Sequence, residues 1–522
     1  MRLPNNDILG VDLCNLMNAI FDLARSNPWW LDPSKINDEP QIRAFDESLV
    51  KWQPHLSKYI SLKQSGFSLY TIRGPRQVGK TTFTKILIRN LLMQENVPAP
   101  QIFYWTCDSI KNHRELENTI RTYINYSRSQ DTDGKKRHLN LFIDEITFVP
   151  KWQRAIKSLF ETNLLDDTTV IATGSHALAV REGMGELTGR TGDAGEPAHK
   201  MFVPMKFAEY ISCVDHNSWG AFCREGLDEG RKRRQLLKDF LLDNKPGWQL
   251  PMNILMAKER LDNALDSYMI TGGLPIAINQ YLKEKKVSCP VFQRYINATN
   301  ADISRWGLNV GLVKEILAEA CRSLSSETSW TGMGERLGSN HHTIRQYVDM
   351  LVLCFAITYL KKFNPKSRRD KPNQNKKIYF EDPFLFHAIH HWVSSAPIGD
   401  EWATCQNYLT DPASRGKLVE NIVQNHLIRF AFDQNPTSLF DPSSELFHYN
   451  EDGRVIDFIL NLGGRLFPIE VRYQNSISSH DSTAIVSFAR REGTQAILIT
   501  KDQLSVKDHL LEIPASLFLT LV

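Results

Sequence analysis

The segment LYTIRGPRQVGKTT, residues 69–82, constrains the fold of this 522-residue chain more than any other part of its sequence. Residues 74–81 fit the pattern GxxxxGK[ST], with a short apolar run before them and apolar residues at helical spacing after them. Phosphates need backbone N–H groups that turn inward at a helix N-terminus, and glycines permit that turn. A chance Gly-Lys-Thr turn is the alternative, and the flanking patterns disfavour it. The sequence therefore predicts a phosphate-binding loop between a buried strand and a helix.

Two side chains of this loop are expected to contact the nucleotide and its metal. Lys80 supplies a positive charge to the β- and γ-phosphates, and the Thr81 hydroxyl is a ligand for Mg²⁺. The sequence thus predicts ATP and Mg²⁺ as cofactors. The expected nucleotide-binding residues of the loop are Gly74, Pro75, Arg76, Gln77, Val78, Gly79, Lys80, Thr81 and Thr82.

A second apolar run, residues 139–143, ends in Asp144 and Glu145. A strand that ends in two acids is often only a solvated turn, but downstream of a phosphate-binding loop the pair favours catalysis. Asp144 is then placed to hold Mg²⁺, directly or through water, and Glu145 to activate the attacking water. The adjacent acids predict hydrolysis of the β–γ phosphoanhydride of ATP more than passive nucleotide binding.

A third apolar run, residues 169–172, is followed by Thr173 and Ser175. Either hydroxyl could orient the attacking water or sense the γ-phosphate, although a turn that ends the strand explains each residue alone nearly as well. Another strand and a helix are expected within residues 101–126. This alternation predicts a parallel sheet with helices on both faces and the nucleotide at the carboxyl ends of the strands.

Four segments together resemble the AAA+-type ATPases of prokaryotes whose C-terminal region is a domain of unknown function. They are GPRQVGKTT, LFIDEI, TGS and the later VPMKFAEY. The resemblance implies a catalytic Arg190 that reaches the γ-phosphate within its own chain or from a neighbouring subunit of a homo-oligomer. A guanidinium there would stabilise the charge of the transition state. A surface arginine on a glycine-rich loop explains Arg190 equally well.

Residues 310–395 have the pattern of a winged helix-turn-helix. Three helical segments precede two expected strands, one that runs to Leu360 and one at residues 378–380. Between these strands, residues 361–377 contain eight Lys or Arg and one Asp. A basic wing beside a candidate recognition helix suits contacts with the phosphate backbone of DNA or RNA. A protein-binding module, or a hairpin tip that is merely solvated, is as good an explanation.

The C-terminal region resembles the PD-(D/E)xK nuclease fold. A helix that carries Glu420 precedes a strand with Asp457 and a strand with Glu470 and Arg472. The resemblance implies that Asp457 and Glu470, assisted by Glu420, hold a divalent metal ion that generates hydroxide near a scissile phosphate.

Arg472 departs from this pattern, which has Lys at that position. Arg keeps its positive charge, but it does not lose its proton and has a different shape, so the exchange is not conservative at a crowded metal site. Two interpretations stay open: a metal-dependent nuclease, and a degenerate nuclease fold used for binding or assembly.

Together these patterns predict a multidomain α/β protein. Its expected parts are a parallel-sheet P-loop core of the AAA+ type with a helical lid, a winged helix, and a mixed α/β, restriction-endonuclease-like C-terminal domain. The expected boundaries are an N-terminal helical segment at 1–50, the ATPase core at 51–205, the lid at 206–305, the winged helix at 306–410 and the nuclease-like domain at 411–522.

The composition narrows the class of protein only in part. Lys and Arg total 62 against 59 Asp and Glu, a formal charge of +3, so charge does not mark the whole chain as a nucleic-acid binder. The longest apolar run, residues 350–360, is shorter than the roughly 20 residues that span a bilayer, and no membrane association is expected. The N-terminus lacks a secretory pattern and no cysteine pair forms CxxC, so a cytoplasmic protein is expected.

Two functional hypotheses follow from these features. In the first, a Mg²⁺-dependent ATPase couples its nucleotide state to nucleic-acid binding or processing by the C-terminal domains. In the second, the ATPase is a regulatory switch whose winged-helix and degenerate nuclease-like domains bind a protein partner without catalysis. Stimulation of ATP hydrolysis by DNA or RNA distinguishes the two.

Overall fold

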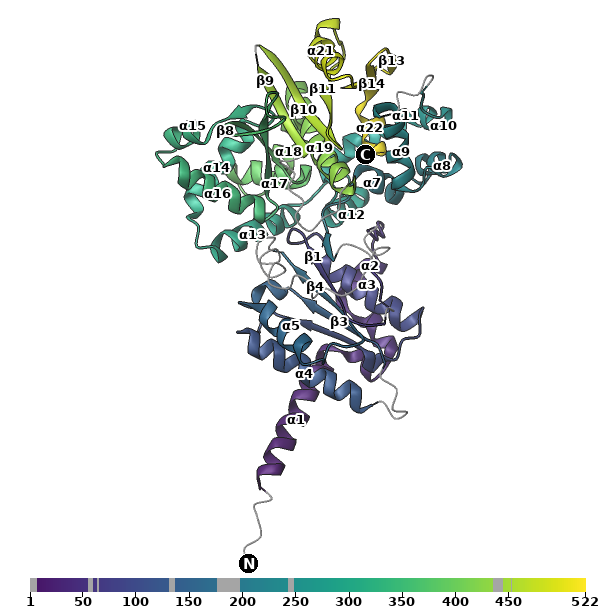
Figure 1. Ribbon diagram of the computed structural model, residues 1–522, viewed down its shortest axis with the longest axis vertical. Helices are drawn as coiled ribbons and strands as arrows, with labels where there is room; N and C mark the ends of the chain where they lie inside the picture. Colours follow the sequence, from purple (N-terminus) through teal and green to yellow (C-terminus); the bar gives the residue numbers. More distant parts are fainter. Residues whose placement is uncertain are drawn as a thin grey trace, which may run out of the picture. The chain divides into compact units, whose positions relative to one another are not determined.

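The computed structural model of the chain divides into two compact units, Met1–Val203 and Pro204–Val522. Each unit is built around a β-sheet, and Figure 1 shows both sheets with the helices that pack on them. The structure describes residues 7–54, 60–62, 65–130, 137–175, 198–242, 248–434, 445–451 and 453–522.

The first unit contains a five-stranded sheet in the order β2–β3–β4–β1–β5, in which all paired strands are parallel. Its strands form from the apolar runs of the sequence, and every residue of β3 and β4 is buried. The predicted parallel sheet is therefore confirmed. The strands are β1 Ser68–Arg73, β2 Ile102–Thr106, β3 Leu139–Asp144, β4 Thr168–Gly174 and β5 His199–Met201.

Helices lie on both sides of this sheet, α4 and α5 on one side and α2 and α3 on the other (Figure 1). Side chains of a strand alternate between its two faces. Leu139, Leu141 and Ile143 of β3 accordingly share one core with apolar residues of α4 and α5. The helices of the first unit are α1 Asp7–Ser26, α2 Pro40–Asp46, α3 Lys80–Met93, α4 His113–Ser129 and α5 Trp152–Glu161.

The second unit begins with a run of helices, which the sequence also predicts for residues 206–300. Its helices are α7 Phe207–Val214, α8 His216–Arg224, α9 Gly230–Leu241, α10 Met252–Met256, α11 Lys258–Thr271, α12 Pro275–Glu284, α13 Cys289–Arg305, α14 Val310–Arg322, α15 Trp330–Arg336, α16 His341–Leu353, α17 Pro383–Val393, α18 Glu401–Thr410, α19 Pro412–Gln434, α21 Thr483–Glu492 and α22 Ala515–Leu521.

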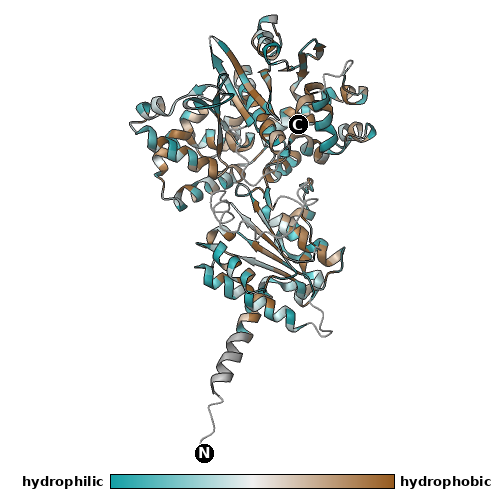
Figure 2. Cartoon of the chain, viewed as in Figure 1, coloured by the Kyte–Doolittle hydropathy of each residue, from teal (hydrophilic) through white to brown (hydrophobic). Residues whose placement is uncertain are grey.

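The sheet of the second unit is mixed and has nine strands in the order β13–β14–β12–β11–β10–β9–β7–β8–β6. Hydrophobic residues follow its strands, as Figure 2 shows along β10. The strands are β6 Glu327–Thr328, β7 Ile357–Asn364, β8 Arg369–Phe380, β9 Leu446–Glu451, β10 Arg454–Leu462, β11 Arg465–Arg472, β12 Ala496–Thr500, β13 Ser505–Lys507 and β14 Leu510–Pro514.

The basic segment 361–377 lies largely within two strands and not in an irregular wing. β7 and β8 form an antiparallel hairpin whose register reaches from Ile357–Phe380 at its base to Asn364–Arg369 at its tip. Leu360 and Phe363 of β7 are both buried, but they are three residues apart and a register shift between Lys361 and Lys362 separates them, so the sequence shows no simple alternation here. The second strand is therefore longer than the predicted 378–380.

This hairpin belongs to the same sheet as the C-terminal strands. β7 pairs with β9 in parallel, with Lys361 opposite Phe447 and Lys362 opposite His448. Phe363 packs in one core with Phe447 and Phe488. Segments expected in two domains thus share a sheet and a core, although the boundary at 410/411 stays a prediction. In the part of the chain described, no helix is long and apolar enough to cross a membrane.

Candidate functional site

The loop between β1 and α3 has a backbone suited to surrounding an anion. Gly79, directly before α3, has a φ of +111°, a left-handed conformation that glycine adopts without strain. Gly74 is required for a different reason, since a Cβ at this position would clash with the carbonyl oxygen of Phe202. The first N–H groups of a helix have no acceptor within it, so the start of α3 favours a phosphate.

Lys80 begins α3 and is buried, with 5% of its surface exposed. Its Nζ donates hydrogen bonds to the carbonyl oxygens of Gly74 and Pro75, both at 2.9 Å. The same nitrogen lies 3.8 Å from Oε1 of Glu145. The ammonium is thus fixed beside the loop, next to the second acid of the Asp-Glu pair.

Asp144, the last residue of β3, accepts hydrogen bonds from three hydroxyl groups, at the start of α3, in the middle of β2 and near the end of β4. Thr81 Oγ1 donates to Asp144 Oδ2 at 2.7 Å, and the Tyr104 hydroxyl donates to the same oxygen at 3.0 Å. Thr173 Oγ1 donates to Oδ1. A hydroxyl and a carboxylate therefore meet where oxygen ligands would suit Mg²⁺.

Glu145 follows β3 in a left-handed conformation, with a φ of +51°. Its N–H donates to Thr173 Oγ1 at 3.0 Å, and its Oε2 accepts a hydrogen bond from Ser175 Oγ at 3.0 Å. The Ser175 N–H also donates to Oε2, at 3.3 Å. Non-glycine residues rarely adopt this backbone conformation unless the surroundings hold it. The Thr173 and Ser175 hydroxyls, at the carboxyl end of β4, thus position both acids.

Sequence reasoning missed a second layer behind Asp144. Lys85 Nζ lies 3.5 Å from the centroid of the Tyr104 ring and 3.3 Å from Oε2 of Glu39. Burial lowers the pKa of Lys85, opposed by the charge of Glu39, and burial raises that of Tyr104, as does the charge of Asp144. The buried Ile88, one turn further along α3, is the neighbour on the same helix face, but the sequence alone does not show that Lys85 contacts Tyr104 and Glu39.

The structure brings together side chains from the start of α3 and from the ends of β3 and β4, namely Lys80, Thr81, Asp144, Glu145, Thr173 and Ser175. Among the other loop residues, the Arg76 guanidinium lies 5.6 Å from the centroid of the Phe148 ring. The predicted Arg190 falls within residues 176–197, outside the described residues.

Glu420 of α19, Asp457 of β10 and Glu470 of β11 also lie together, around a lysine that the sequence pattern does not single out. Lys377 Nζ of β8 donates to Asp457 Oδ1 at 2.8 Å and to Glu420 Oε1 at 3.2 Å. The Tyr379 hydroxyl donates to the same Glu420 oxygen at 2.7 Å. The lysine and the three acids are at most 8% exposed.

Arg472, the arginine in the lysine position of the nuclease pattern, completes this cluster. Its guanidinium forms an ion pair with Glu470, and its Nη1 lies 3.8 Å from Asp457 Oδ2. Its Nε lies 3.4 Å from Asp481 Oδ1. Backbone N–H groups bind the same acids: that of Asp457 donates to Glu470 Oε2 and that of Val471 to Asp457 Oδ2, both at 3.0 Å.

Burial and mutual repulsion perturb the titration of these acids. Burial, followed by the charge of Asp457, raises the pKa of Glu420 to about 7 and holds that of Glu470 well above its ordinary value. Burial opposes the charge of Lys377, but Asp457 and Glu420 raise its pKa above the ordinary value. The charged lysine is therefore the form that the cluster stabilises.

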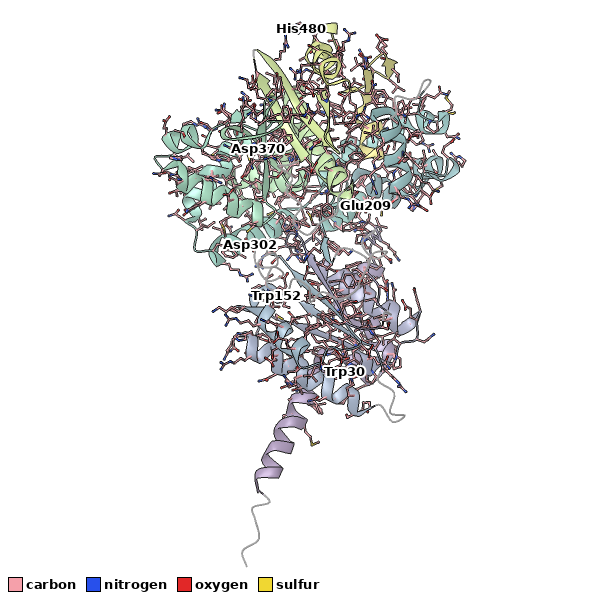
Figure 3. The ribbon with its side chains drawn as sticks, in the orientation of Figure 1. Trp30, Trp152, Glu209, Asp302, Asp370 and His480 are labelled. Carbon is pink, nitrogen blue, oxygen red and sulfur yellow. The ribbon has the colours of Figure 1, made fainter. Side chains whose placement is uncertain are left out.

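The basic residues of the hairpin are in large part engaged within the chain. Lys361 pairs with Asp370 at 2.8 Å, and Arg368 with Glu492 at 2.7 Å. Figure 3 labels Asp370 on this hairpin. Four of the eight basic residues, Lys361, Arg368, Lys371 and Lys377, form ion pairs. Burial lowers the pKa of a further one, Lys376, to about 8.

Comparison with protein families assigns the parts of the chain in sequence order. Residues 67–211 match the model of an AAA domain. Residues 262–396 and 415–518 match two models that are each described as a domain of unknown function, DUF8612 and DUF4143. The resemblance to an AAA-type ATPase followed by domains of unknown function is therefore confirmed.

Individual relatives and solved structures are distant from this chain. An uncharacterized protein of Haemophilus influenzae is 21% identical over 459 residues, which cover 87% of this chain and 94% of the relative. A Walker-type ATPase of Pyrococcus abyssi aligns at 13% identity with a TM-score of 0.37, covering 68% of this chain and 95% of that one. The ORC2 protein of Aeropyrum pernix aligns at 11% identity with a TM-score of 0.32, covering 68% and 98%.

The family match to residues 67–211 agrees with the sheet order and the loop described above. The first unit contains an AAA-type Walker ATPase domain, which implies ATP binding and hydrolysis, typically with Mg²⁺. The two domains of unknown function carry no assigned role.

Proposed function

We propose that this chain binds ATP with Mg²⁺ at the loop between β1 and α3 and hydrolyses its β–γ phosphoanhydride there. The observation that carries the proposal is the convergence of a buried lysine, a hydroxyl and two acids. Lys80 lies 3.8 Å from Glu145, and Thr81 donates to Asp144 at 2.7 Å. A phosphate, a metal ion and a water molecule each find a matching group within this small region.

Each side chain has a role that its contacts support. Lys80 binds the β- and γ-phosphates. The carbonyl oxygens of Gly74 and Pro75 accept hydrogen bonds from its ammonium group and hold that group beside the loop. Thr81 and Asp144 fit Mg²⁺, because both present oxygen ligands, and the bound ion would neutralise phosphate charge. Glu145 accepts the proton of the attacking water, while Thr173 positions Asp144 and the backbone of Glu145.

Arg190 is proposed to stabilise the charge that develops on the γ-phosphate, in its own chain or from a neighbouring copy. This role rests on the sequence, where Gly189-Arg190 follows the strand that ends in Thr173 and Ser175. Arginine suits the task because its planar guanidinium donates several hydrogen bonds and stays charged. A role in a neighbouring copy requires a homo-oligomer.

Replacement of Glu145 by Gln tests the chemical step. The amide keeps the size and the hydrogen-bond acceptor but removes the base, so turnover should fall by roughly 10²–10⁴ while ATP binding persists. The measurements are phosphate release and equilibrium binding of a fluorescent ATP analogue. Glu47→Gln, at an exposed glutamate after α2, is the matched control. Unchanged turnover in Glu145→Gln would remove the assignment.

We further propose that the nucleotide state of the first unit controls binding by the second unit. Nucleic acid is one candidate ligand, because Lys366 and Arg369 are exposed near the tip of the basic hairpin. Phosphate contacts by such residues would make the affinity strongly salt-dependent.

A protein partner is the second candidate, and the internal ion pairs of the hairpin favour it. Ion pairs with Asp370, Glu492, Glu451 and Asp457 neutralise four of its basic residues, which reduces the charge offered to a polynucleotide. In this version the ATPase is a regulatory switch and the second unit catalyses nothing. ATP hydrolysis measured with and without duplex DNA or RNA separates the candidates, since only the first expects stimulation.

A further inference from the structure

The nuclease-like pattern implies that Glu420, Asp457 and Glu470 hold a divalent metal ion. The residues around these acids show whether such an ion fits. A hard cation needs carboxylate oxygens at about 2.0–2.6 Å and a position for water. In the structure, Asp457 Oδ1 and Glu420 Oε1 both accept hydrogen bonds from Lys377 Nζ, at 2.8 Å and 3.2 Å. A metal ion on these two oxygens would collide with the ammonium.

Three of the four remaining carboxylate oxygens, those of Asp457 and Glu470, are also engaged. Glu470 forms an ion pair with Arg472, and its Oε2 accepts the N–H of Asp457. Asp457 Oδ2 accepts the N–H of Val471 and lies 3.8 Å from Arg472. Two cations therefore already face three acids. Within the described residues, no group of three or more His, Cys, Asp or Glu is arranged to hold a metal ion.

Burial argues in the same direction. Lys377 is 3% exposed and Glu470 2% exposed, so neither water nor a phosphodiester has direct access to the acids. An ion that displaced Lys377 would leave the ammonium in a buried environment without its partners, which is costly. The residues present therefore do not fit the metal.

We infer that the side chains of Lys377 and Arg472 are the cations of this cluster. They occupy the position that a divalent metal ion would take. The cluster links three elements of the second unit. It joins strand β8 of the basic hairpin to helix α19 through Glu420 and to strand β10 through Asp457. Side-chain amides extend the same junction, since Asn421 and Asn425 of α19 bind the backbone of Phe380 at the end of β8.

In this assignment the acid cluster is a structural link without a metal ion, and it holds the hairpin, α19 and β10 together. The sequence shows the three acids and Arg472, which resemble a nuclease site with one substitution. Lys377 is supplied from a strand in a different region of the chain, where it is one of eight basic residues, and only the fold shows that it points into the acids.

The test measures Mn²⁺ binding to the full chain without nucleotide, by electron paramagnetic resonance and by thermal unfolding. All proteins carry Asp144→Asn so that the first unit contributes no metal site. With Lys377 present, we expect no bound Mn²⁺ and the same unfolding midpoint in Mn²⁺ and in EDTA. One bound Mn²⁺ that disappears in Asp457→Asn would overturn the inference.

Lys377→Met supplies the second arm, since methionine fills the space but removes the cation. In EDTA, we expect the thermal unfolding midpoint of this variant to fall by roughly 10 °C, as for a broken buried ion pair. In Mn²⁺, we expect one ion to bind and to restore part of the lost midpoint. Lys371→Met, on the same strand but paired with the half-buried Glu451, should gain no metal. Absence of Mn²⁺ binding in folded Lys377→Met would contradict the inference. If that variant does not fold, the measurement of Mn²⁺ binding to the protein that keeps Lys377 tests the inference by itself.

Discussion

At the scale of single residues, the candidate ATP site depends on Asp144 having three hydrogen-bond donors. Thr81 is the donor that the loop pattern predicts, and Thr173 is one of two hydroxyls expected at the end of the third strand. Tyr104 was not expected, because nothing in the sequence distinguishes a tyrosine that faces the site from one that faces the core. Its neighbour Lys85, which lies over the Tyr104 ring and pairs with Glu39, was missed for the same reason.

Tyr104→Phe tests whether this outer contact positions the metal ligand. Loss of such a contact typically weakens metal binding about 10-fold or more, so the Mg²⁺ concentration for half-maximal ATP hydrolysis should rise by at least this factor. Turnover at saturating Mg²⁺ should change much less. Tyr123→Phe, which loses a hydrogen bond to the Pro100 carbonyl oxygen instead, serves as the control. An unchanged Mg²⁺ requirement in Tyr104→Phe would show that the hydroxyl is structural only.

At the scale of elements, local patterns predicted the first unit better than the second. The apolar runs of β1, β3 and β4 and the helix that starts at Lys80 lie where the sequence places them, because each is a short apolar segment that is largely buried in the first unit. The hairpin of β7 and β8 was only partly predicted. Its parallel pairing with β9 joins segments far apart in the chain, and such pairing leaves no local signal.

The hairpin also provides a test of nucleic-acid binding at this scale. If its tip contacts phosphates, Lys366→Glu with Arg369→Glu should weaken binding of duplex DNA and reduce the slope of log affinity against log salt by about 2. Lys283→Glu with Lys286→Glu, two exposed lysines near the end of α12, is the charge-matched control. Equal affinity and equal salt slope for the two double variants would exclude the hairpin tip and leave the protein-partner version.

At the scale of the whole molecule, the chain combines a first unit with recognisable chemistry and a second unit in which two cationic side chains pair with three clustered acids. The AAA domain at residues 67–211 implies ATP binding and hydrolysis. In the second unit, Lys377 and Arg472 hold the three acids that the sequence pattern assigns to a metal. The sequence could show these acids but not the lysine between them, since the approach of β8 depends on the sheet. The AAA domain therefore accounts for ATP chemistry in the first unit, whereas the acid cluster of the second unit is held by side chains of the chain itself.

The most direct test of the central claim is phosphate release from ATP by the purified full chain, measured in Mg²⁺ and in EDTA, for the unmodified protein and for Lys80→Ala. We predict release that requires Mg²⁺ and is lost in Lys80→Ala, because that variant lacks the ammonium that binds the β- and γ-phosphates. Release that persists in EDTA, or that is unchanged in Lys80→Ala, would contradict hydrolysis at the loop between β1 and α3.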